Sequence, residues 1–178
     1  MSSWRPGDRR ADRSSMLRVD QAGEYGATRI YAGQLAVLRR NCPEAKLIAR
    51  MAAQEERHLK RFNALIADRR VRPTVLQPLW NVAGFALGAA TALMSEKAAL
   101  ACTDAVETEI DRHYADQLSA LGDEDPELSA DIAEFQAEEL EHRDTAREAG
   151  AAQAVGYPLL TATIRAGCRV AIGLSKRI

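Results

Sequence analysis

The sequence predicts an all-α domain, on the strength of its composition, its lack of strand patterns and the spacing of its turns. Alanine, leucine, glutamate and arginine dominate the chain, and all four are good helix formers. β-branched runs are scarce, and no stretch alternates apolar with polar residues for long enough to indicate a sheet. We therefore expect a single helical domain over residues 16–178, preceded by a short disordered tail over residues 1–15.

Turn residues divide this domain into five expected helices and one extra apolar stretch. Asn41-Cys42-Pro43 marks the first turn, Gly122 ends a helix, and Asp125-Pro126 starts the next. The apolar stretch, Pro73–Ser95, has no charged residue and is expected to be a crossover helix. The five expected helices cover residues 15–40, 43–68, 96–121, 126–150 and 158–178.

Charge and cysteine usage exclude several classes of function. The formal net charge of −1 provides no basic field to attract nucleic acid. Cys42, Cys102 and Cys168 are odd in number and far apart, which argues against a zinc knuckle and a disulfide framework. We expect three buried free thiols. The tail lacks the apolar core of a secretory signal.

A repeated pattern of acids and histidines carries the chemistry. Each half of the chain holds a lone glutamate and then a Glu-x-x-His pair, with gaps of 31 and 32 residues between the glutamates. The six residues are Glu24, Glu55 and His58 in the first half, and Glu107, Glu139 and His142 in the second. The midpoint of each gap falls at an expected turn, so two antiparallel helices bring each lone glutamate to the level of its Glu-x-x-His pair. Six ligands at one level predict a ferritin-like four-helix di-iron carboxylate bundle.

The faces of the expected helices separate these acids from their neighbours. Glu55 shares an apolar face with Met51 and Phe62, whereas Glu56 aligns with Lys60. The neighbouring acids expected on solvent faces are Glu56, Glu109, Glu138 and Glu141. A single Glu-x-x-His usually means a solvated face, but two with matching upstream glutamates are hard to obtain by chance. Four carboxylates at one level repel one another, and two divalent cations resolve that conflict. The donor set favours iron or manganese.

Two residues of the fourth helical segment are candidates for contact with the metal ligands. His113 precedes Tyr114, and this histidine is expected either to hydrogen-bond a ligand carboxylate and move protons or to lie partly exposed on a helix flank. Tyr31 and Tyr114 each follow a lone glutamate by seven residues. Most such tyrosines are core residues, and Tyr114 is the better candidate because of its histidine neighbour.

Several segments resemble the demethoxyubiquinone hydroxylase family, the di-iron monooxygenases of ubiquinone biosynthesis. They are residues 17–27 (LRVDQAGEYGA), 72–74 (RPT) with 78–88 (PLWNVAGFALG), 101–103 (ACT), 138–142 (EELEH) and 166–172 (AGCRVAI). The similarity covers nearly the whole chain from about Met16. It implies the same six metal ligands, with His113 and Tyr114 beside them. The connection between the fourth and fifth helical segments is shorter than in animal members, which leaves partner contacts open.

The resemblance also implies a reaction. Two iron ions would activate O₂ to hydroxylate the benzoquinone ring of a polyprenylated demethoxyubiquinone precursor. No Gly-x-Gly-x-x-Gly follows a strand, so electrons are expected from a partner protein or from NADH. Two alternatives compete with this interpretation. One is a soluble ferritin-like iron-storage or peroxide-reducing protein, and the other is a metal-free quinone- or lipid-binding bundle.

The uncharged stretch raises the question of a membrane. Pro73–Ser95 is long enough to span a bilayer, but spanning would separate the two ligand pairs. It is therefore expected to run along the bundle with one face in lipid. Gly84 and Gly88 permit close helix approach, either between or within chains.

The C-terminal helix is expected to be amphipathic. Its apolar face holds Leu160, Ile164, Ala171 and Leu174, and its cations are Arg165, Arg169, Lys176 and Arg177. This pattern favours an in-plane membrane helix with cationic anchors, although ordinary packing onto the bundle competes. The expected location is the cytoplasmic face of a bacterial inner membrane or the matrix face of the mitochondrial inner membrane. The expected partners are a polyprenyl quinone, the membrane surface and other ubiquinone-biosynthesis proteins.

Overall fold

The computed structural model describes residues 11–39 and 41–177, which are almost entirely helical and include no strand. The helices are α1 (Arg13–Val37), α2 (Pro43–Asp68), α3 (Gln77–Met94), α4 (Glu96–Leu121), α5 (Pro126–Glu148), the short 3₁₀ helix η1 (Ala151–Gln153) and α6 (Tyr157–Ser175). The expected all-α fold is confirmed, and the expected bounds of α2 and α4 match those observed. Residues 1–10 of the expected tail lie outside the described residues, whereas residues 13–15 already belong to α1.

Side-chain caps determine where the main helices begin. In each case the capping atom accepts a hydrogen bond from the backbone N–H three residues later, which satisfies one free donor of the first turn. The capping residues are Asp12 for α1, Cys42 for α2, Ser95 for α4 and Asp125 for α5. Pro43 and Pro126 follow two of these caps, where a missing N–H costs nothing. The α4–α5 turn is closed by Gly122, whose φ of +49° suits glycine.

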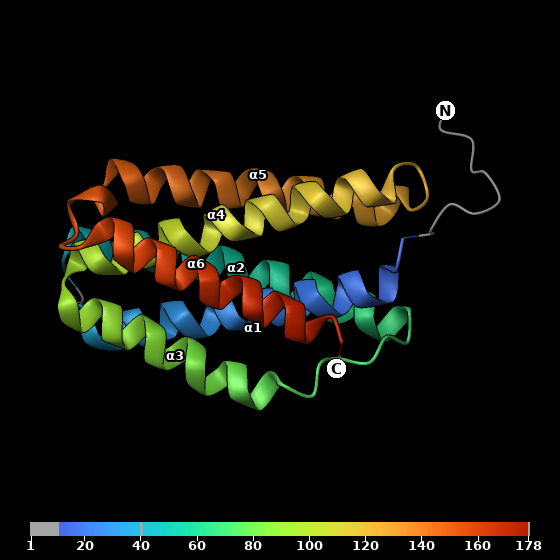
Figure 1. Ribbon diagram of the computed structural model, residues 1–178, viewed down its shortest axis with the longest axis horizontal. Coiled ribbons are helices and arrows are strands. Elements are labelled where there is room, and N and C mark those ends of the chain that lie inside the picture. The colour runs from blue at the N-terminus through green and yellow to red at the C-terminus, as the bar shows by residue number, and fades with distance from the viewer. Residues whose placement is uncertain (1–10, 40, 178) are drawn as a thin grey trace.

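Four helices, α1, α2, α4 and α5, lie alongside one another as an elongated bundle (Figure 1). Each of the pairs α1–α2 and α4–α5 packs along its length. The remaining helices cover the outside, with α3 against α1 and α4, and α6 against α4 and α1. This arrangement is consistent with the ferritin-like helical bundle predicted from the ligand spacing.

Helix α3 packs unusually close to α1, and glycines make this possible. A Cβ atom added at Gly88 would lie 1.9 Å from the carbonyl oxygen of Ile30. One added at Gly33 would lie 2.1 Å from the carbonyl oxygen of Phe85. The Gly84 and Gly88 pair therefore serves helix packing within the chain, which decides between the two possibilities that the sequence leaves open.

Helix α6 is held to α4 by two ion pairs to one buried carboxylate, and this contradicts one expectation. Glu109 is only 2% exposed, and its Oε1 accepts hydrogen bonds from Arg165 Nε and Arg169 Nη1, each at 2.8 Å. The expected solvent face for Glu109 is wrong because α6 covers that side of α4. Since Arg165 and Arg169 bind this carboxylate, Lys176 and Arg177 are the cations of this set left as candidate membrane anchors.

The cysteines depart in part from expectation. Cys102 is buried, but Cys42 and Cys168 are only half-buried, and all three are free thiols. Cys42 is accessible because it sits at the start of α2, where its Sγ accepts from the backbone N–H of Ala45 at 3.3 Å. The expectation of three buried thiols is therefore wrong for two of them.

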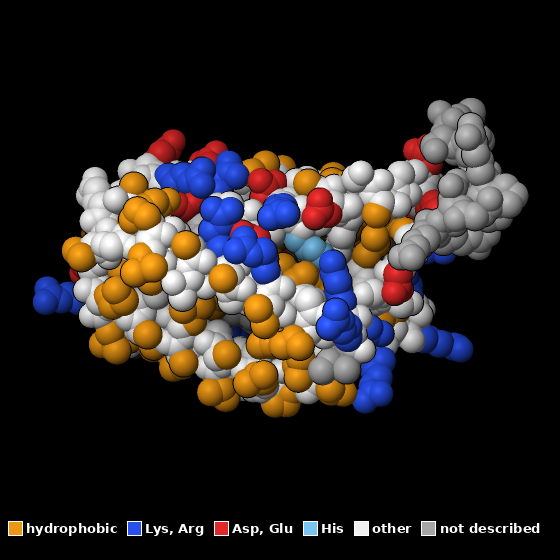
Figure 2. Space-filling model, viewed as in Figure 1, with side chains coloured by type: hydrophobic (Ala, Val, Ile, Leu, Met, Phe, Trp, Pro, Cys, Tyr) orange, Lys and Arg blue, Asp and Glu red, His pale blue; other side chains and the backbone are white. Residues whose placement is uncertain are grey.

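Large apolar side chains are exposed along α3 and α6. Figure 2 shows hydrophobic side chains gathered over these helices, with lysine and arginine side chains nearby. We call these residues the apolar face; they are Val75, Leu79, Val82, Phe85, Leu93 and Met94 on or beside α3, and Leu159, Val170 and Leu174 on α6. Among the described residues, no helix combines the length and hydrophobicity needed to cross a membrane.

Candidate metal centre

The structure brings all six sequence-predicted ligand residues together inside the bundle. Each of the four bundle helices contributes, with Glu24 from α1, Glu55 and His58 from α2, Glu107 from α4, and Glu139 and His142 from α5. Every one of these side chains is buried, with at most 3% of its surface exposed. The equal spacing from the two turns therefore produces the predicted level of carboxylates and imidazoles.

The six residues form two overlapping groups, each with ligand atoms within 4.8 Å of one another. We call them position one (Glu24, Glu55, His58, Glu139) and position two (Glu55, Glu107, Glu139, His142). Glu55 and Glu139 belong to both. In position one, His58 Nδ1 lies 3.1 Å from Glu139 Oε1 and 3.4 Å from Glu24 Oε2. In position two, His142 Nδ1 lies 3.1 Å from Glu139 Oε2 and 3.2 Å from Glu55 Oε1.

Burial and mutual repulsion control protonation in this cluster. The pKa values of Glu55 and Glu107 lie well above the ordinary range, first because the side chains are buried and then because neighbouring carboxylates repel their charge. Burial likewise raises the pKa of Glu139. Burial by itself would lower the pKa of His58, but the adjacent carboxylates of Glu139 and Glu24 outweigh it and raise this pKa to about 10. Without a cation, these raised pKa values favour protonated carboxyl groups in the cluster.

Two carboxylate oxygens test whether the residues suit a metal. Glu24 Oε2 and Glu55 Oε1 are buried and accept no hydrogen bond, although each lies near a histidine nitrogen. Unsatisfied buried acceptors are costly, and divalent cations satisfy them. Four carboxylates and two imidazoles with no thiolate form a donor set that suits iron or manganese better than zinc or copper. The cluster is therefore able to hold metal ions.

Two tyrosines cross the bundle to hold the lone glutamates. Tyr31 Oη on α1 donates to Glu107 Oε1 on α4 at 2.8 Å, and Tyr114 Oη on α4 donates to Glu24 Oε1 on α1. Each tyrosine therefore binds the glutamate of the other half. Sequence reasoning ranked Tyr114 first and missed the equal part of Tyr31. The signal was present, because both tyrosines follow a lone glutamate by seven residues.

His113 lies in a separate buried network. Its Nε2 is 3.3 Å from Asp20 Oδ1, and the same oxygen accepts from Gln117 Nε2 at 2.7 Å. Burial raises the pKa of Asp20, although its bonds to His113 and Gln117 oppose the change. Asp20 lies one helical turn before Glu24. The polar contacts of His113 described here run to Asp20 and Gln117, so this histidine touches the ligand level only through neighbouring residues.

Glu138 also departs from expectation. Its side chain is 20% exposed, and its Oε2 lies 2.7 Å from His58 Nε2. The solvent face expected for Glu138 is wrong because α2 approaches this side of α5 with His58 and Arg57. In contrast, Glu56 and Glu141 are exposed as expected.

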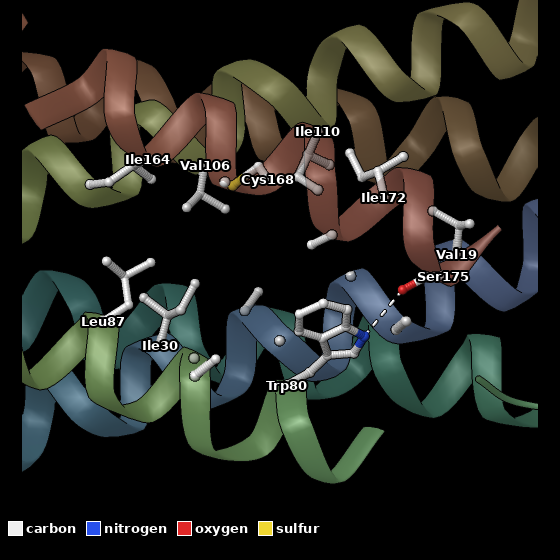
Figure 3. Close-up of a pocket in the computed structure, with 18 of the residues that line it drawn as sticks. Val19, Ile30, Trp80, Leu87, Val106, Ile110, Ile164, Cys168, Ile172 and Ser175 are labelled. Carbon is white, nitrogen blue, oxygen red and sulfur yellow. Dashed lines mark hydrogen bonds between the residues drawn. The ribbon is translucent and has the colours of Figure 1, made fainter. Parts of the chain in front are cut away.

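An apolar cavity of about 400 Å³ lies between α1, α3, α4 and α6. Figure 3 shows side chains from these helices pointing into it, among them Ile30, Leu87, Val106 and Ile164. One end holds a polar contact, in which Trp80 Nε1 donates to Ser175 Oγ at 3.1 Å. Such a cavity suits an apolar ligand with few polar groups.

A second, much smaller pocket lies between this cavity and the metal-ligand level, and it is too narrow to admit water. It shares Ala27, Ile30 and Val106 with the large cavity, and its far side is formed by residues that include Glu107. Thr103 also lines it, and the buried hydroxyl of Thr103 has no hydrogen-bond partner. Only a thin layer of side chains therefore separates the apolar cavity from position two.

A family model described as ubiquinone biosynthesis protein COQ7 matches residues 11–175 of this chain. This chain belongs to that family. The match covers α1 to α6 and every residue of the two candidate metal positions. The resemblance inferred from the sequence motifs is therefore confirmed.

Three relatives of this chain have names that describe a demethoxyubiquinone or demethoxyubiquinol hydroxylase. A Rhodospirillum rubrum protein named 3-demethoxyubiquinol 3-hydroxylase is 57% identical over 162 residues, covering 91% of this chain and 76% of that protein. The human protein named NADPH-dependent 3-demethoxyubiquinone 3-hydroxylase, mitochondrial, is 53% identical over 173 residues, covering 95% and 79%. The yeast protein named 5-demethoxyubiquinone hydroxylase, mitochondrial, is 44% identical over 179 residues, covering 92% and 77%.

Proposed function

We propose that this chain is a di-iron monooxygenase that hydroxylates the quinone ring of a polyprenylated demethoxyubiquinone precursor in ubiquinone biosynthesis. The observation that carries this proposal is the buried cluster of four glutamates and two histidines beside an apolar cavity. The hydroxylase names of the bacterial, human and yeast relatives supply the substrate class. One oxygen atom of O₂ replaces a ring hydrogen as hydroxyl, and the other leaves as water with two electrons from an external reductant.

We assign the metal ligands to the six residues of positions one and two. Glu55 and Glu139 belong to both groups, so they would contribute to holding either ion. When bound, two iron ions supply the O₂ activation that none of the side chains here performs alone. Manganese suits the same donor set, and the monooxygenase assignment favours iron.

The protein's own residues would orient the centre and keep it dry. Tyr31 and Tyr114 each fix one oxygen of a lone glutamate by a hydrogen bond, which restricts the orientation of that carboxylate. Phe135 stacks on the ring of His58 with 4.1 Å between centroids, and Phe62 packs against Phe135. These aromatic contacts cover one face of the His58 ring. A water-poor site favours productive oxygen transfer over side reactions.

We propose that the large cavity receives the quinone head and the first part of its tail. Its lining is apolar, which suits a prenyl chain, and its inner wall of Ala27, Ile30 and Val106 is shared with the small pocket beside Glu107. Small movements of Ile30 and Val106 side chains would connect the two. The substrate ring would then approach the metals from the side of position two.

We further propose that the apolar face docks on the membrane surface. A contiguous exposed apolar surface is a liability in water, and the two helices that carry it, α3 and α6, also line the cavity. A polyprenyl quinone resides in the bilayer, so this arrangement would allow its head to enter without crossing water. The mitochondrial names of the eukaryotic relatives fit a matrix-side location for them, and we propose the cytoplasmic face of the inner membrane as the bacterial equivalent.

The electron donor is proposed as a nicotinamide nucleotide. The sequence favoured NADH or a partner protein, and the name of the human relative specifies NADPH. The cavity proposed for the quinone has an apolar lining, which does not suit a charged nucleotide. We therefore propose that the nucleotide delivers electrons near or through the quinone. Other ubiquinone-biosynthesis proteins remain proposed partners.

The decisive experiment is a single turnover under ¹⁸O₂. The chain is loaded anaerobically with two equivalents of Fe(II) and mixed with a short-tailed demethoxyubiquinone analogue and NADPH or NADH. The mass of the quinone product is then measured by mass spectrometry. One ¹⁸O atom in the hydroxylated ring is the expected result. A Glu139→Ala variant is the matched loss-of-metal control. Oxidation of stored iron without any labelled quinone would favour the ferritin-like alternative instead.

A further inference from the structure

The outer ring nitrogens of the two cluster histidines have different partners. His58 turns its Nδ1 toward position one, and its Nε2 lies 2.7 Å from Glu138 Oε2. His142 turns its Nδ1 toward position two, and its Nε2 lies 2.9 Å from Gln54 Oε1. Both partner atoms are acceptors, so each Nε2 donates to its partner, and each Nδ1 is the atom that would offer a lone pair to a metal ion.

These contacts cross between the two halves of the chain. Gln54 immediately precedes Glu55 of the first Glu-x-x-His, but it contacts His142 of the second. Glu138 immediately precedes Glu139 of the second, but it contacts His58 of the first. Each motif therefore supplies the residue that orients the histidine of the other motif. This reciprocity couples α2 and α5 at the level of the ligands.

The two partners differ in charge. The Glu138 carboxylate is an anionic acceptor, which increases the electron donation of an imidazole more than a neutral amide does. Arg57 Nη2 binds the same Oε2 of Glu138 at 2.5 Å, which holds the carboxylate in place and offsets part of its charge. Gln54 offers His142 only a neutral oxygen. The two positions are otherwise matched, since each has three glutamates and one histidine.

We propose that Glu138 and Gln54 are positioning residues that orient the two histidines crosswise, and that the charge of Glu138 makes position one the tighter metal site. The inference rests on the proposed metal centre and adds an order of filling to it. An asymmetric pair fills stepwise, so a chain with one ion holds it in position one. Position two would hold the second ion, and its ligand Glu107 lines the small pocket next to the apolar cavity.

Anaerobic calorimetric titration with Fe(II) tests this without any measurement of turnover. The wild-type chain is expected to bind two ions in two resolved steps. Glu138→Gln keeps an acceptor oxygen but removes the charge, so the tighter step should weaken by about 10- to 100-fold and approach the weaker one. Glu141→Gln, an exposed acid on the same helix, is the matched control and should leave both steps unchanged.

The reverse substitution guards against a purely structural effect. Gln54→Glu gives His142 an anionic partner and is expected to tighten the weaker step, which damage to the fold would not do. Mössbauer spectra of ⁵⁷Fe should show two distinct ferrous sites in the wild type and more similar ones in Glu138→Gln. The inference is overturned if both Fe(II) affinities are unchanged in Glu138→Gln, or if Glu138→Gln and Glu141→Gln lose the same affinity. Either result leaves the proposed metal centre in place. A wild-type chain that takes up no Fe(II) overturns the metal centre as well.

Discussion

Tyr31 on α1 and Glu107 on α4 are joined by a 2.8 Å hydrogen bond although 76 residues separate them in the sequence. The counterpart bond from Tyr114 to Glu24 runs in the opposite direction between the same two helices. Each lone glutamate is therefore held by a tyrosine from the helix that carries the other one. The two bonds link the two halves of the chain at the level where metal ions are proposed to bind.

Removing these hydroxyls should disturb the metal centre more than the fold. Tyr31→Phe leaves Glu107 Oε1 without its donor. We expect the free energy of unfolding of the iron-loaded protein to fall by about 1–3 kcal/mol. Tyr114→Phe should act similarly through Glu24. Melting temperatures of iron-loaded and chelator-treated protein measure the difference. Tyr25→Phe, a half-buried tyrosine outside these bonds, is the control, and equal losses in all three variants would contradict the prediction.

Replacing a ligand residue should lower the iron content of the protein, whereas replacing an exposed acid should not. Glu139→Ala removes a carboxylate common to both positions, so we expect the loss of at least one iron ion per chain. Glu56→Ala changes an exposed acid beside a ligand and should retain both ions. Iron analysis after gel filtration gives the answer, and equal loss from both variants would refute the ligand assignment.

Chelator-treated protein should lose stability as pH rises above neutrality. The pKa of His58 is about 10 in the folded protein, above its ordinary value of 6.5, so its stabilising contribution is complete below 6.5 and disappears as pH rises toward 10. The raised pKa values of Glu55 and Glu107 act in the same direction. Burial lowers the pKa of His142, and its penalty applies only below about 6.5, outside this window.

The melting temperature of the chelator-treated protein should therefore fall between about pH 7 and about pH 10. Iron-loaded protein should show a smaller decrease, because bound cations replace the protons. His58→Gln in the chelator-treated form should flatten the slope. A melting temperature that rises over this range would show that other groups dominate.

Quinone access to the metal centre should depend on the size of the side chain at position 106. Val106 lines both pockets and is 6% exposed, so a phenylalanine at this position occupies the space between the cavity and Glu107. We expect quinone hydroxylation to be lost while iron content is retained, with a stability cost of about 1–3 kcal/mol from overpacking. Val106→Ile is the conservative control. Normal turnover of a bulky quinone by Val106→Phe would exclude this route.

Acidic substitutions on the apolar face should release the protein from membranes. Leu79 and Val82 are 51% and 68% exposed, so glutamate at both positions costs little folding stability but repels an anionic bilayer. Flotation with anionic liposomes should show loss of binding. Ala53→Glu, at an exposed position on α2, is the matched control. Equal flotation of the double variant and the wild type would disprove docking through α3.

The sequence by itself determined the parts of the molecule that depend on local spacing. Helix α2 begins at Pro43 and helix α4 ends before Gly122, as these turn residues predict, because capping and backbone conformation are local properties. The six cluster residues were found for a related reason. Equal distances from a turn place two residues at one level of an antiparallel pair, so their coming together follows from chain geometry.

Only the tertiary structure decided which helix covers which face. Glu109 and Glu138 have the periodicity of surface acids, but α6 buries the first and His58 of α2 binds the second. The crossing of Tyr31 to Glu107, and the cavity under α3 and α6, likewise depend on how helices far apart in the chain pack together. Helical periodicity shows that a face is apolar or polar, whereas the partner of that face is selected by packing across the whole bundle.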